Sequence, residues 1–139
     1  MPSEAGKPLI ECIDWTITDR CNCSCLHCFH AADNTIHRDE FSYDEAMQLL
    51  DDIVDCGIPA VRLTGGEPTL YPYFREVVKG IRKRGLTLKT LITNGTLLND
   101  ELLGFLKEYS PKTEIMISFD GIGCHDWLRQ RKGSEEQAL

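Results

Sequence analysis

Three cysteines near the start of the chain could do metal chemistry. Cys21, Cys25 and Cys28 are separated by three and then by two residues, so their sulfurs can converge on one centre without closing a long loop. Thiolates at such spacing bind soft metals and iron–sulfur clusters. A cluster held by three cysteines leaves one iron open, as a site needs when that iron binds a substrate or a cofactor. The spacing therefore favours an iron–sulfur site.

Zinc is the competing interpretation of the same thiols. Structural zinc normally takes four ligands, usually as two separated pairs, and no second pair follows at the expected distance. Cys23 could be the fourth ligand, but it is only two residues from Cys21 and from Cys25 and would crowd a single metal ion. A zinc site and unbound thiols both remain open as alternatives.

A second group of residues follows the short apolar run 60–64. In the sequence Gly65-Gly66-Glu67-Pro68, two glycines allow a close approach of the backbone to a ligand. Glu67 offers an acceptor for an ammonium group, and Pro68 fixes the exit of the turn. Taken alone, the segment also fits an ordinary turn between a strand and a helix, with a solvated glutamate.

Two further polar turns contain Asn94, Ser118 and Asp120, in the segments 94–95 and 118–121. Each is a common turn sequence by itself. Together with the cysteine loop and the glycine turn, however, they follow the carboxyl ends of four predicted parallel strands. Ligands bind at that edge in open sheets and in barrels. The sequence therefore predicts one site at one rim, built from four turns.

The elements that position these turns alternate along the chain. Strands are predicted over 13–18, 60–64, 86–93 and 114–119. Helices are predicted between them, one capped by a capping box at Ser42, one opened by Pro72 and one capped by Asn99. This order predicts the α/β class, with parallel strands covered by helices. A doubly wound sheet and an arc of a barrel both fit it.

Composition excludes several functions. The chain has 139 residues, of which 42% are hydrophobic and 27% charged, as in one globular domain. Its net charge of −7 has the wrong sign for tracking nucleic-acid phosphates or anionic lipid. Residues 1–7 lack the features of a secretion signal, and no run is long enough to span a membrane. We therefore expect a cytoplasmic protein with no nucleic-acid or membrane partner, whose odd number of cysteines points to metal or catalysis.

Several remaining residues have simpler interpretations. Cys12 and Cys56 are expected to be buried small hydrophobic residues, and Phe119 is expected in the core. His30 and His37 lie in a polar loop, where solvated side chains are the rule.

The motifs together resemble those of one family. The segment 21–28 resembles the CxxxCxxC signature of radical S-adenosylmethionine (radical SAM) enzymes, and 65–68 resembles their GGEP motif. The segments 93–95, 118–121 and 125–129 are similar to later strand ends of that superfamily. The likeness runs from about residue 15 to residue 134. His27 departs from the pattern, because the residue before the third cysteine is often Tyr or Phe.

The resemblance implies an incomplete (β/α)6 barrel of the TIM type, with about four strands in this chain. It implies that Cys21, Cys25 and Cys28 ligate a 4Fe–4S cluster and that the open iron is chelated by the methionyl amine and carboxylate of S-adenosylmethionine. Glu67 and the backbone of Gly65 and Gly66 would hold the amino group.

Three more residues follow from the same resemblance. Ser118 and Asp120 lie where the family contacts the ribose or the carboxylate, with Asn94 nearby. The implied reaction is reductive cleavage of S-adenosylmethionine to methionine and a deoxyadenosyl radical, which abstracts a hydrogen from a substrate. An electron donor such as flavodoxin or ferredoxin would supply the electron.

Within the superfamily, these motifs most resemble those of members that carry a SPASM-type extension and that modify peptides or mature cofactors. The resemblance therefore implies a peptide or a cofactor precursor as the substrate. A capping box at 134–137 predicts a helix beginning at about Gln137, two residues before the end of the chain. We therefore expect 1–139 to be the amino-terminal part of a radical SAM core domain. The rest of the barrel and any auxiliary-cluster domain would be absent, and the fourth strand would be an exposed edge.

Two other functions remain open. One is a module without catalytic activity that binds zinc or transfers electrons through an iron–sulfur centre. The other is an inactive truncated fragment.

Overall fold

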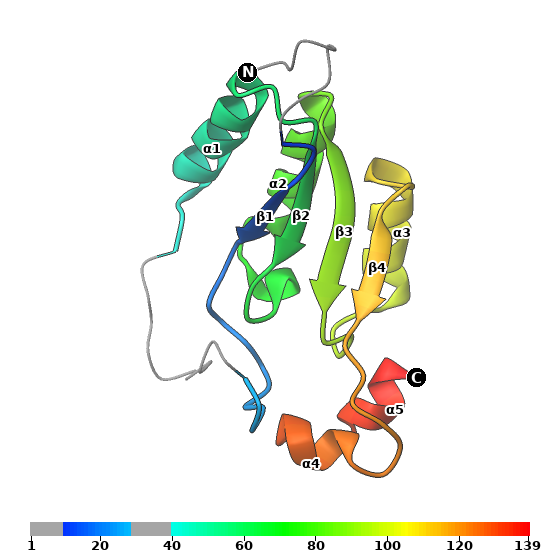
Figure 1. Cartoon of the computed structure of the whole chain (residues 1–139). Helices are drawn as coiled ribbons and strands as arrows, with labels where there is room; N and C mark the ends of the chain where they lie inside the picture. The colour runs from blue at the N-terminus through cyan, green and yellow to red at the C-terminus, as the bar shows by residue number, and fades with distance from the viewer. Residues whose placement is uncertain (1–9, 29–39) are drawn as a thin grey trace.

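A parallel sheet forms the centre of the molecule (Figure 1). The structure is a computed structural model and describes residues 10–28 and 40–139. The strand order of the sheet is β1-β2-β3-β4, and each neighbouring pair is parallel. The strands are β1 (Ile13–Thr16), β2 (Ala60–Thr64), β3 (Thr87–Thr93) and β4 (Glu114–Ile117). The strands expected from the sequence are thus confirmed, with β1 and β4 each ending two residues earlier than predicted.

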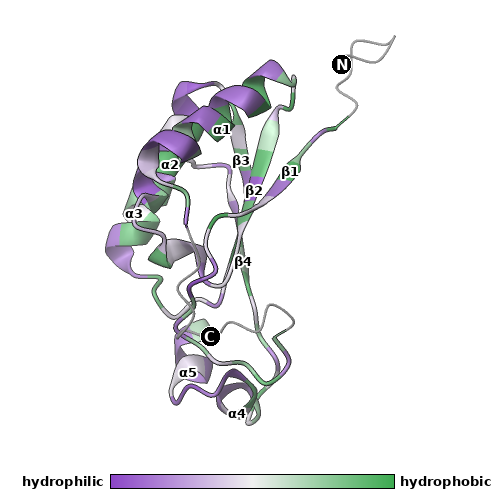
Figure 2. Ribbon diagram, turned by 90° about the vertical axis from the view of Figure 1, so that its left-hand side faces the viewer, coloured by the Kyte–Doolittle hydropathy of each residue, from purple (hydrophilic) through white to green (hydrophobic). Residues whose placement is uncertain are grey.

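Three helices cover one face of this sheet: α1 (Tyr43–Asp55), α2 (Phe74–Lys83) and α3 (Asp100–Tyr109) (Figure 2). The capping box before α1 is formed, because the Ser42 backbone N–H donates to the Glu45 carboxylate and the Glu45 N–H donates to the Ser42 hydroxyl. The Asn99 side chain accepts from the Leu102 N–H at 2.8 Å and caps α3. The expected caps of α1 and α3 are therefore confirmed.

The topology decides between the two architectures that fit the sequence. A doubly wound sheet reverses its strand order and places helices on both faces. Here the strands follow one another in sequence order, and α1, α2 and α3 lie on the same face (Figure 2). The α/β class is confirmed, and the sheet is an arc of a barrel rather than a doubly wound sheet.

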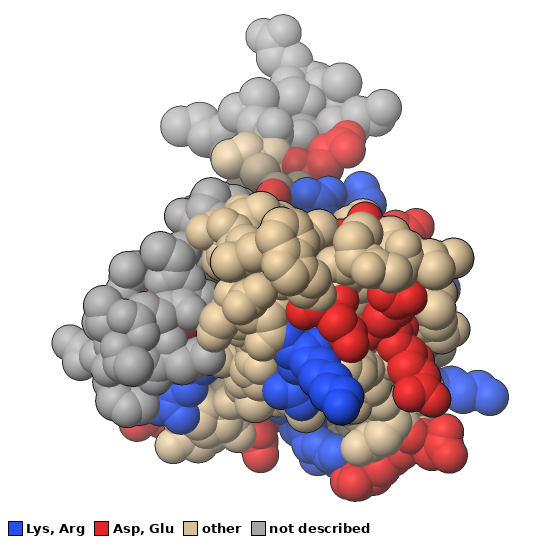
Figure 3. All heavy atoms as spheres, turned by 90° about the horizontal axis from the view of Figure 1, so that it is seen from below, with Lys and Arg blue, Asp and Glu red and all other residues tan. Residues whose placement is uncertain are grey.

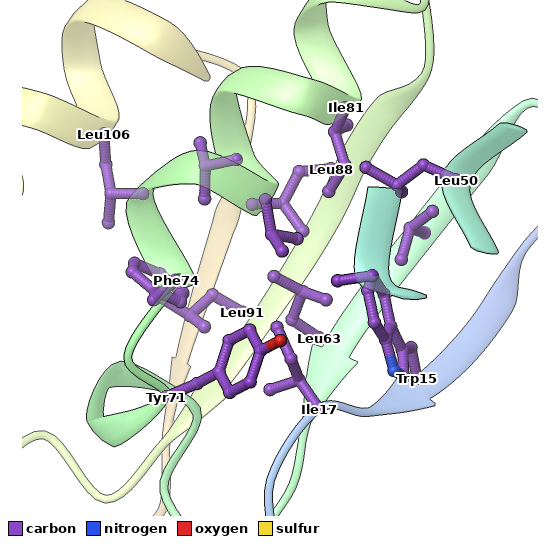
Figure 4. Close-up of a cluster of buried hydrophobic side chains, with 14 of the residues drawn as sticks. Trp15, Ile17, Leu50, Leu63, Tyr71, Phe74, Ile81, Leu88, Leu91 and Leu106 are labelled. Carbon is purple, nitrogen blue, oxygen red and sulfur yellow. The ribbon is translucent and has the colours of Figure 1, made fainter. Parts of the chain in front are cut away.

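The core lies between the sheet and these helices (Figure 4). The strands contribute buried side chains such as Leu63 and Leu91, and the helices contribute Leu50, Val77 and Ile81, each at most 1% exposed. Figure 2 shows the apolar sides of the helices turned toward the sheet. Burial of this surface holds the sheet and its helices together.

Three short helices add to these elements, and only the last of them lies where a helix was expected from the sequence. The 3-10 helix η1 (Pro68–Leu70) follows the glycine turn, so α2 begins at Phe74 and not at Pro72. The helices α4 (His125–Arg129) and α5 (Ser134–Ala138) lie beyond the carboxyl ends of β3 and β4 (Figure 1).

The predicted start of the last helix was wrong. Helix α5 begins at Ser134 and not at Gln137, and no capping box forms there. The Ser134 hydroxyl instead donates to the Asp126 carboxylate at 2.9 Å. A contact from α4 thus replaces the local cap that the sequence suggested.

Two residues expected to be buried are exposed. Cys56 is exposed at the carboxyl end of α1, and Phe119 is 40% exposed because it lies past the end of β4, where it stacks on His125. His30 and His37 lie outside the described residues, as does the segment 1–7. Among the helices over 10–28 and 40–139, none has both the length and the apolar character that a membrane crossing needs.

Candidate functional site

The four predicted turns meet at the carboxyl ends of the strands, around a pocket of about 250 Å³. Seven of the ten residues that the sequence analysis singled out line it: Cys21, Cys25, Cys28, Gly65, Gly66, Asn94 and Ser118. Cys23, His27 and Arg129 are further lining residues. Viewed from below, this end of the molecule carries both basic and acidic side chains (Figure 3).

The glycine turn packs tightly against the segment that leads into the cysteine loop. The Gly66 N–H donates to the Thr18 carbonyl at 2.8 Å, and the Glu67 N–H donates to the Arg20 carbonyl at 2.7 Å. A Cβ atom would lie 2.4 Å from the Thr18 oxygen at Gly65 and 2.3 Å from the Arg20 oxygen at Gly66. The structure thus gives the glycines a role within the chain, since any side chain would push the cysteine loop away.

The Glu67 side chain is placed differently from the expectation. It is 0% exposed, and neither Glu67 nor Pro68 is among the lining residues of the pocket. Its carboxylate accepts from the Thr69 N–H and hydroxyl, from the Thr93 hydroxyl at 2.8 Å and from the Asn94 N–H at 2.8 Å. Because a buried carboxylate must be satisfied by donors, these bonds tie Glu67, which follows β2, to the end of β3.

Asn94 connects the end of β3 to the cysteine loop. Its side-chain amide donates to the Asn22 side-chain oxygen at 2.8 Å and lies 3.5 Å from the Cys23 sulfur and 3.9 Å from the Cys21 sulfur. Its own oxygen accepts from the Thr96 N–H and hydroxyl. Asn94 is therefore oriented toward the sulfurs from its side of the pocket.

The thiols differ in acidity. Chiefly a hydrogen bond with the Cys23 thiol lowers the pKa of Cys21 to about 6, against an opposing effect of burial. The same interaction and burial raise the pKa of Cys23. Burial also raises the pKa of Cys25, and the Arg129 guanidinium opposes that rise. The lowered pKa favours the thiolate form of Cys21, which is the form that binds metals.

The cysteine loop is held along its other side by α4 and the residues after it. The Ser24 N–H donates to the Arg129 carbonyl at 3.2 Å, and the Leu26 N–H donates to the Leu128 carbonyl at 2.8 Å. The Arg131 guanidinium donates to the Asn22 carbonyl at 3.0 Å. Helical periodicity did not predict α4, since its five residues are too few to show a period; the likeness of 125–129 to the family was the one signal.

Asp120 also differs from the expectation. Both its carboxylate oxygens accept from the Arg129 guanidinium, at 2.6 and 3.1 Å, and Asp120 is not among the lining residues of the pocket. Ser118, by contrast, borders the pocket, and its backbone N–H donates to the Thr93 carbonyl at 3.0 Å. Of the two residues in this turn, only Ser118 borders the pocket.

A family model and several known proteins are similar in sequence to this chain. The model of the Radical SAM superfamily matches residues 15–139. The Fe-coproporphyrin III synthase of Methanosarcina barkeri is 34% identical over 138 residues, which are 99% of this chain and 33% of that protein. The antilisterial bacteriocin subtilosin biosynthesis protein AlbA of Bacillus subtilis is 33% identical over 127 residues, 87% of this chain and 27% of that protein.

Solved structures show the same fold. SuiB of Streptococcus suis bound to S-adenosylmethionine superposes with a TM-score of 0.76 at 18% identity, over 93% of this chain and 30% of SuiB. The chain spans about a third of the length of the curated relatives it matches. It belongs to the radical SAM superfamily, a superfamily of enzymes that use a 4Fe–4S cluster and S-adenosylmethionine.

Proposed function

We propose that Cys21, Cys25 and Cys28 bind a 4Fe–4S cluster whose fourth iron is open to S-adenosylmethionine. The observation that carries the proposal is the pocket itself, which these thiols share with Gly65, Gly66 and other polar residues at the carboxyl ends of the strands. The donor set fits the group, because none of the three cysteines forms a disulfide and the pKa of one of them, Cys21, is lowered.

The chemistry that the loaded site would supply is reductive cleavage of S-adenosylmethionine to methionine and a deoxyadenosyl radical, which abstracts a hydrogen from the substrate. The chain's own residues would bind and orient. The backbone of Gly65 and Gly66 would meet the methionyl amino group, and Asn94 and Ser118 would offer polar contacts from the turns that follow β3 and β4. Glu67 would act indirectly, by holding the turn against the end of β3.

The substrate class that we propose is a peptide or a cofactor precursor. AlbA is named for bacteriocin biosynthesis, the Methanosarcina relative is named as a synthase, and SuiB has been solved with its precursor peptide SuiA. An electron donor such as flavodoxin or ferredoxin in the cytoplasm would complete the reaction.

Anaerobic reconstitution with iron and sulfide, followed by electron paramagnetic resonance, tests the proposal. We expect a reduced-cluster signal that changes when S-adenosylmethionine is added, because the cofactor binds the open iron. Cys28→Ser removes a proposed ligand and should abolish the signal. The matched variant Cys56→Ser changes an exposed thiol outside the pocket and should leave the signal intact. A reduced-cluster signal that does not change when S-adenosylmethionine is added would overturn the proposed activity.

Metal analysis separates the proposal from zinc binding. A zinc ion needs its ligand sulfurs about 2.3 Å from one centre. Within 10–28 and 40–139, no three Cys, His, Asp or Glu side chains are grouped closely enough to bind one metal ion. One tightly bound zinc per chain with no acid-labile sulfide would favour the zinc module instead.

A further inference from the structure

We infer that Arg129 is a positioning residue for the proposed cluster: it donates a hydrogen bond to the sulfur of Cys25 and thereby makes the cluster easier to reduce. The inference rests on the proposed function, because it concerns a ligand of the proposed cluster.

The geometry of the guanidinium carries the inference. One terminal nitrogen, Nη1, lies 3.6 Å from the Cys25 Sγ atom, within the range of a hydrogen bond to sulfur. The other two nitrogens, Nε and Nη2, donate to the two carboxylate oxygens of Asp120 at 2.6 and 3.1 Å. The Arg129 side chain is only 12% exposed. Asp120 therefore fixes the plane of the guanidinium, and that plane directs the remaining N–H groups at the cysteine.

Asp120 is itself held in place. Its backbone N–H donates to His125 Nδ1 at 3.1 Å, and the His125 side chain is fully buried and stacked on Phe119. From the cysteine loop, the His27 ring nitrogen lies 3.5 Å from a carboxylate oxygen of Asp120. The turn after β4 thus reaches the cysteine loop through a short chain of defined contacts.

A hydrogen bond to a ligand sulfur changes how readily a cluster takes up an electron. Reduction adds negative charge to the cluster and its sulfurs, so a donor at the sulfur stabilises the reduced state more than the oxidised state. An arginine suits this position because its planar fork can bind a carboxylate with two N–H groups and still present a third nitrogen. Removing the guanidinium should therefore make the cluster harder to reduce.

The test is a redox titration of the reconstituted protein without S-adenosylmethionine, monitored by electron paramagnetic resonance. At the potential where half of the wild-type cluster is reduced, Arg129→Met should lower the ratio of reduced to oxidised cluster about fivefold. That change equals about 40 mV for a one-electron couple, at 59 mV per tenfold. Asp120→Asn keeps the arginine but weakens its hold, and should lower the ratio about twofold.

Arg131→Met is the matched control. It removes the same charge two residues along, but its guanidinium donates to the Asn22 carbonyl and not to a proposed ligand sulfur. We expect it to leave the ratio nearly unchanged. Iron and sulfide content and thermal unfolding show that each variant is loaded and folded. Should Arg129→Met fail to load, the Asp120→Asn titration decides by itself.

The outcomes are distinct. A wild-type protein without a 4Fe–4S signal contradicts the proposed function. A wild-type signal with an unchanged ratio in the variants of Arg129 and Asp120 overturns the inference alone. An equal shift in Arg131→Met also overturns it, since net charge rather than the contact with Cys25 would then set the potential.

Discussion

The two ends of the molecule are stabilised by different kinds of interaction. The body, which we define as β1–β3 with α1–α3, packs fully buried side chains such as Leu63 and Val77. The rim, defined as the cysteine loop with residues 94–96 and 118–139, leaves Ile122 83% and Trp127 65% exposed. It is held instead by directional polar contacts, such as the one between Arg129 and Asp120.

This difference separates stability from chemistry. Burial of apolar surface is not directional, so the body tolerates local adjustment while its core stays filled. The rim must keep sulfurs and polar groups at fixed positions, and hydrogen bonds supply that geometry. Changes in the body should therefore mainly alter the free energy of unfolding, whereas changes in the rim should mainly alter the site.

The largest effect is expected in the core of the body. Leu106 on α3 is 3% exposed, and Leu106→Ala should lower the free energy of unfolding by about 2–4 kcal/mol, because it removes buried methyl groups and leaves a cavity. Urea unfolding followed by circular dichroism measures this change.

Leu103 provides the control on the same helix. Its side chain is 41% exposed, so Leu103→Ala should cost less than about 1 kcal/mol. Similar losses for the two variants would show that burial of this helix does not determine the stability of the body.

Glu67 lies at the boundary between the body and the rim, and an intermediate effect is expected there. Glu67→Gln keeps the shape but turns an N–H group toward donors from Thr69, Thr93 or Asn94. The free energy of unfolding should fall by about 1–3 kcal/mol, since buried donors lose their acceptor. Urea unfolding again gives the value.

Glu76→Gln is the matched change at an exposed glutamate on α2, and it should alter the free energy of unfolding by less than about 0.5 kcal/mol. If Glu67 instead served the ligand directly, Glu67→Gln would leave unfolding unchanged and weaken the binding of S-adenosylmethionine. Equilibrium binding to the reconstituted protein distinguishes the two roles.

The body could be predicted from the sequence because its signals are local. The capping box of Ser42 and Glu45 predicts the start of α1, and the N-cap Asn99 predicts the start of α3. The spacing of apolar residues predicts the buried sides of both helices. The choice between a barrel arc and a doubly wound sheet could not be made in this way. It depends on which face each helix covers, and that is a property of packing between elements distant in the sequence.

The rim was predicted only in outline. Strand ends located the site, since parallel strands bring their carboxyl ends to one edge. The partners of the Glu67 and Asp120 carboxylates could not be predicted, because their donors come from other elements. Thr93 at the end of β3 donates to Glu67, and Arg129 on α4 donates to Asp120. A polar side chain does not reveal from sequence alone whether it faces a ligand or another part of the chain.

Asp126 offers the smallest effect, and it tests the polar character of the rim directly. Its carboxylate accepts from the backbone N–H groups of Glu135 at 2.7 Å and Gly133 at 2.6 Å, and from the Ser134 hydroxyl. These bonds, that of Glu135 first, hold the pKa of Asp126 below its ordinary value of 3.8. Because the folded-state pKa is the lower one, the stabilisation is fully present above the unfolded-state pKa and is lost as pH falls through the folded-state pKa.

Nuclear magnetic resonance of the amide groups makes this loss visible. The Gly133 and Glu135 amide signals should titrate together with a midpoint below 3.8, as α5 is released from α4. Asp126→Asn should remove that transition, whereas Glu136→Gln, at an exposed position on the same helix, should preserve it. A midpoint at or above the ordinary value, or the same transition in Asp126→Asn, would mean that another group anchors α5. The rim would then depend less on directional contacts than its geometry indicates.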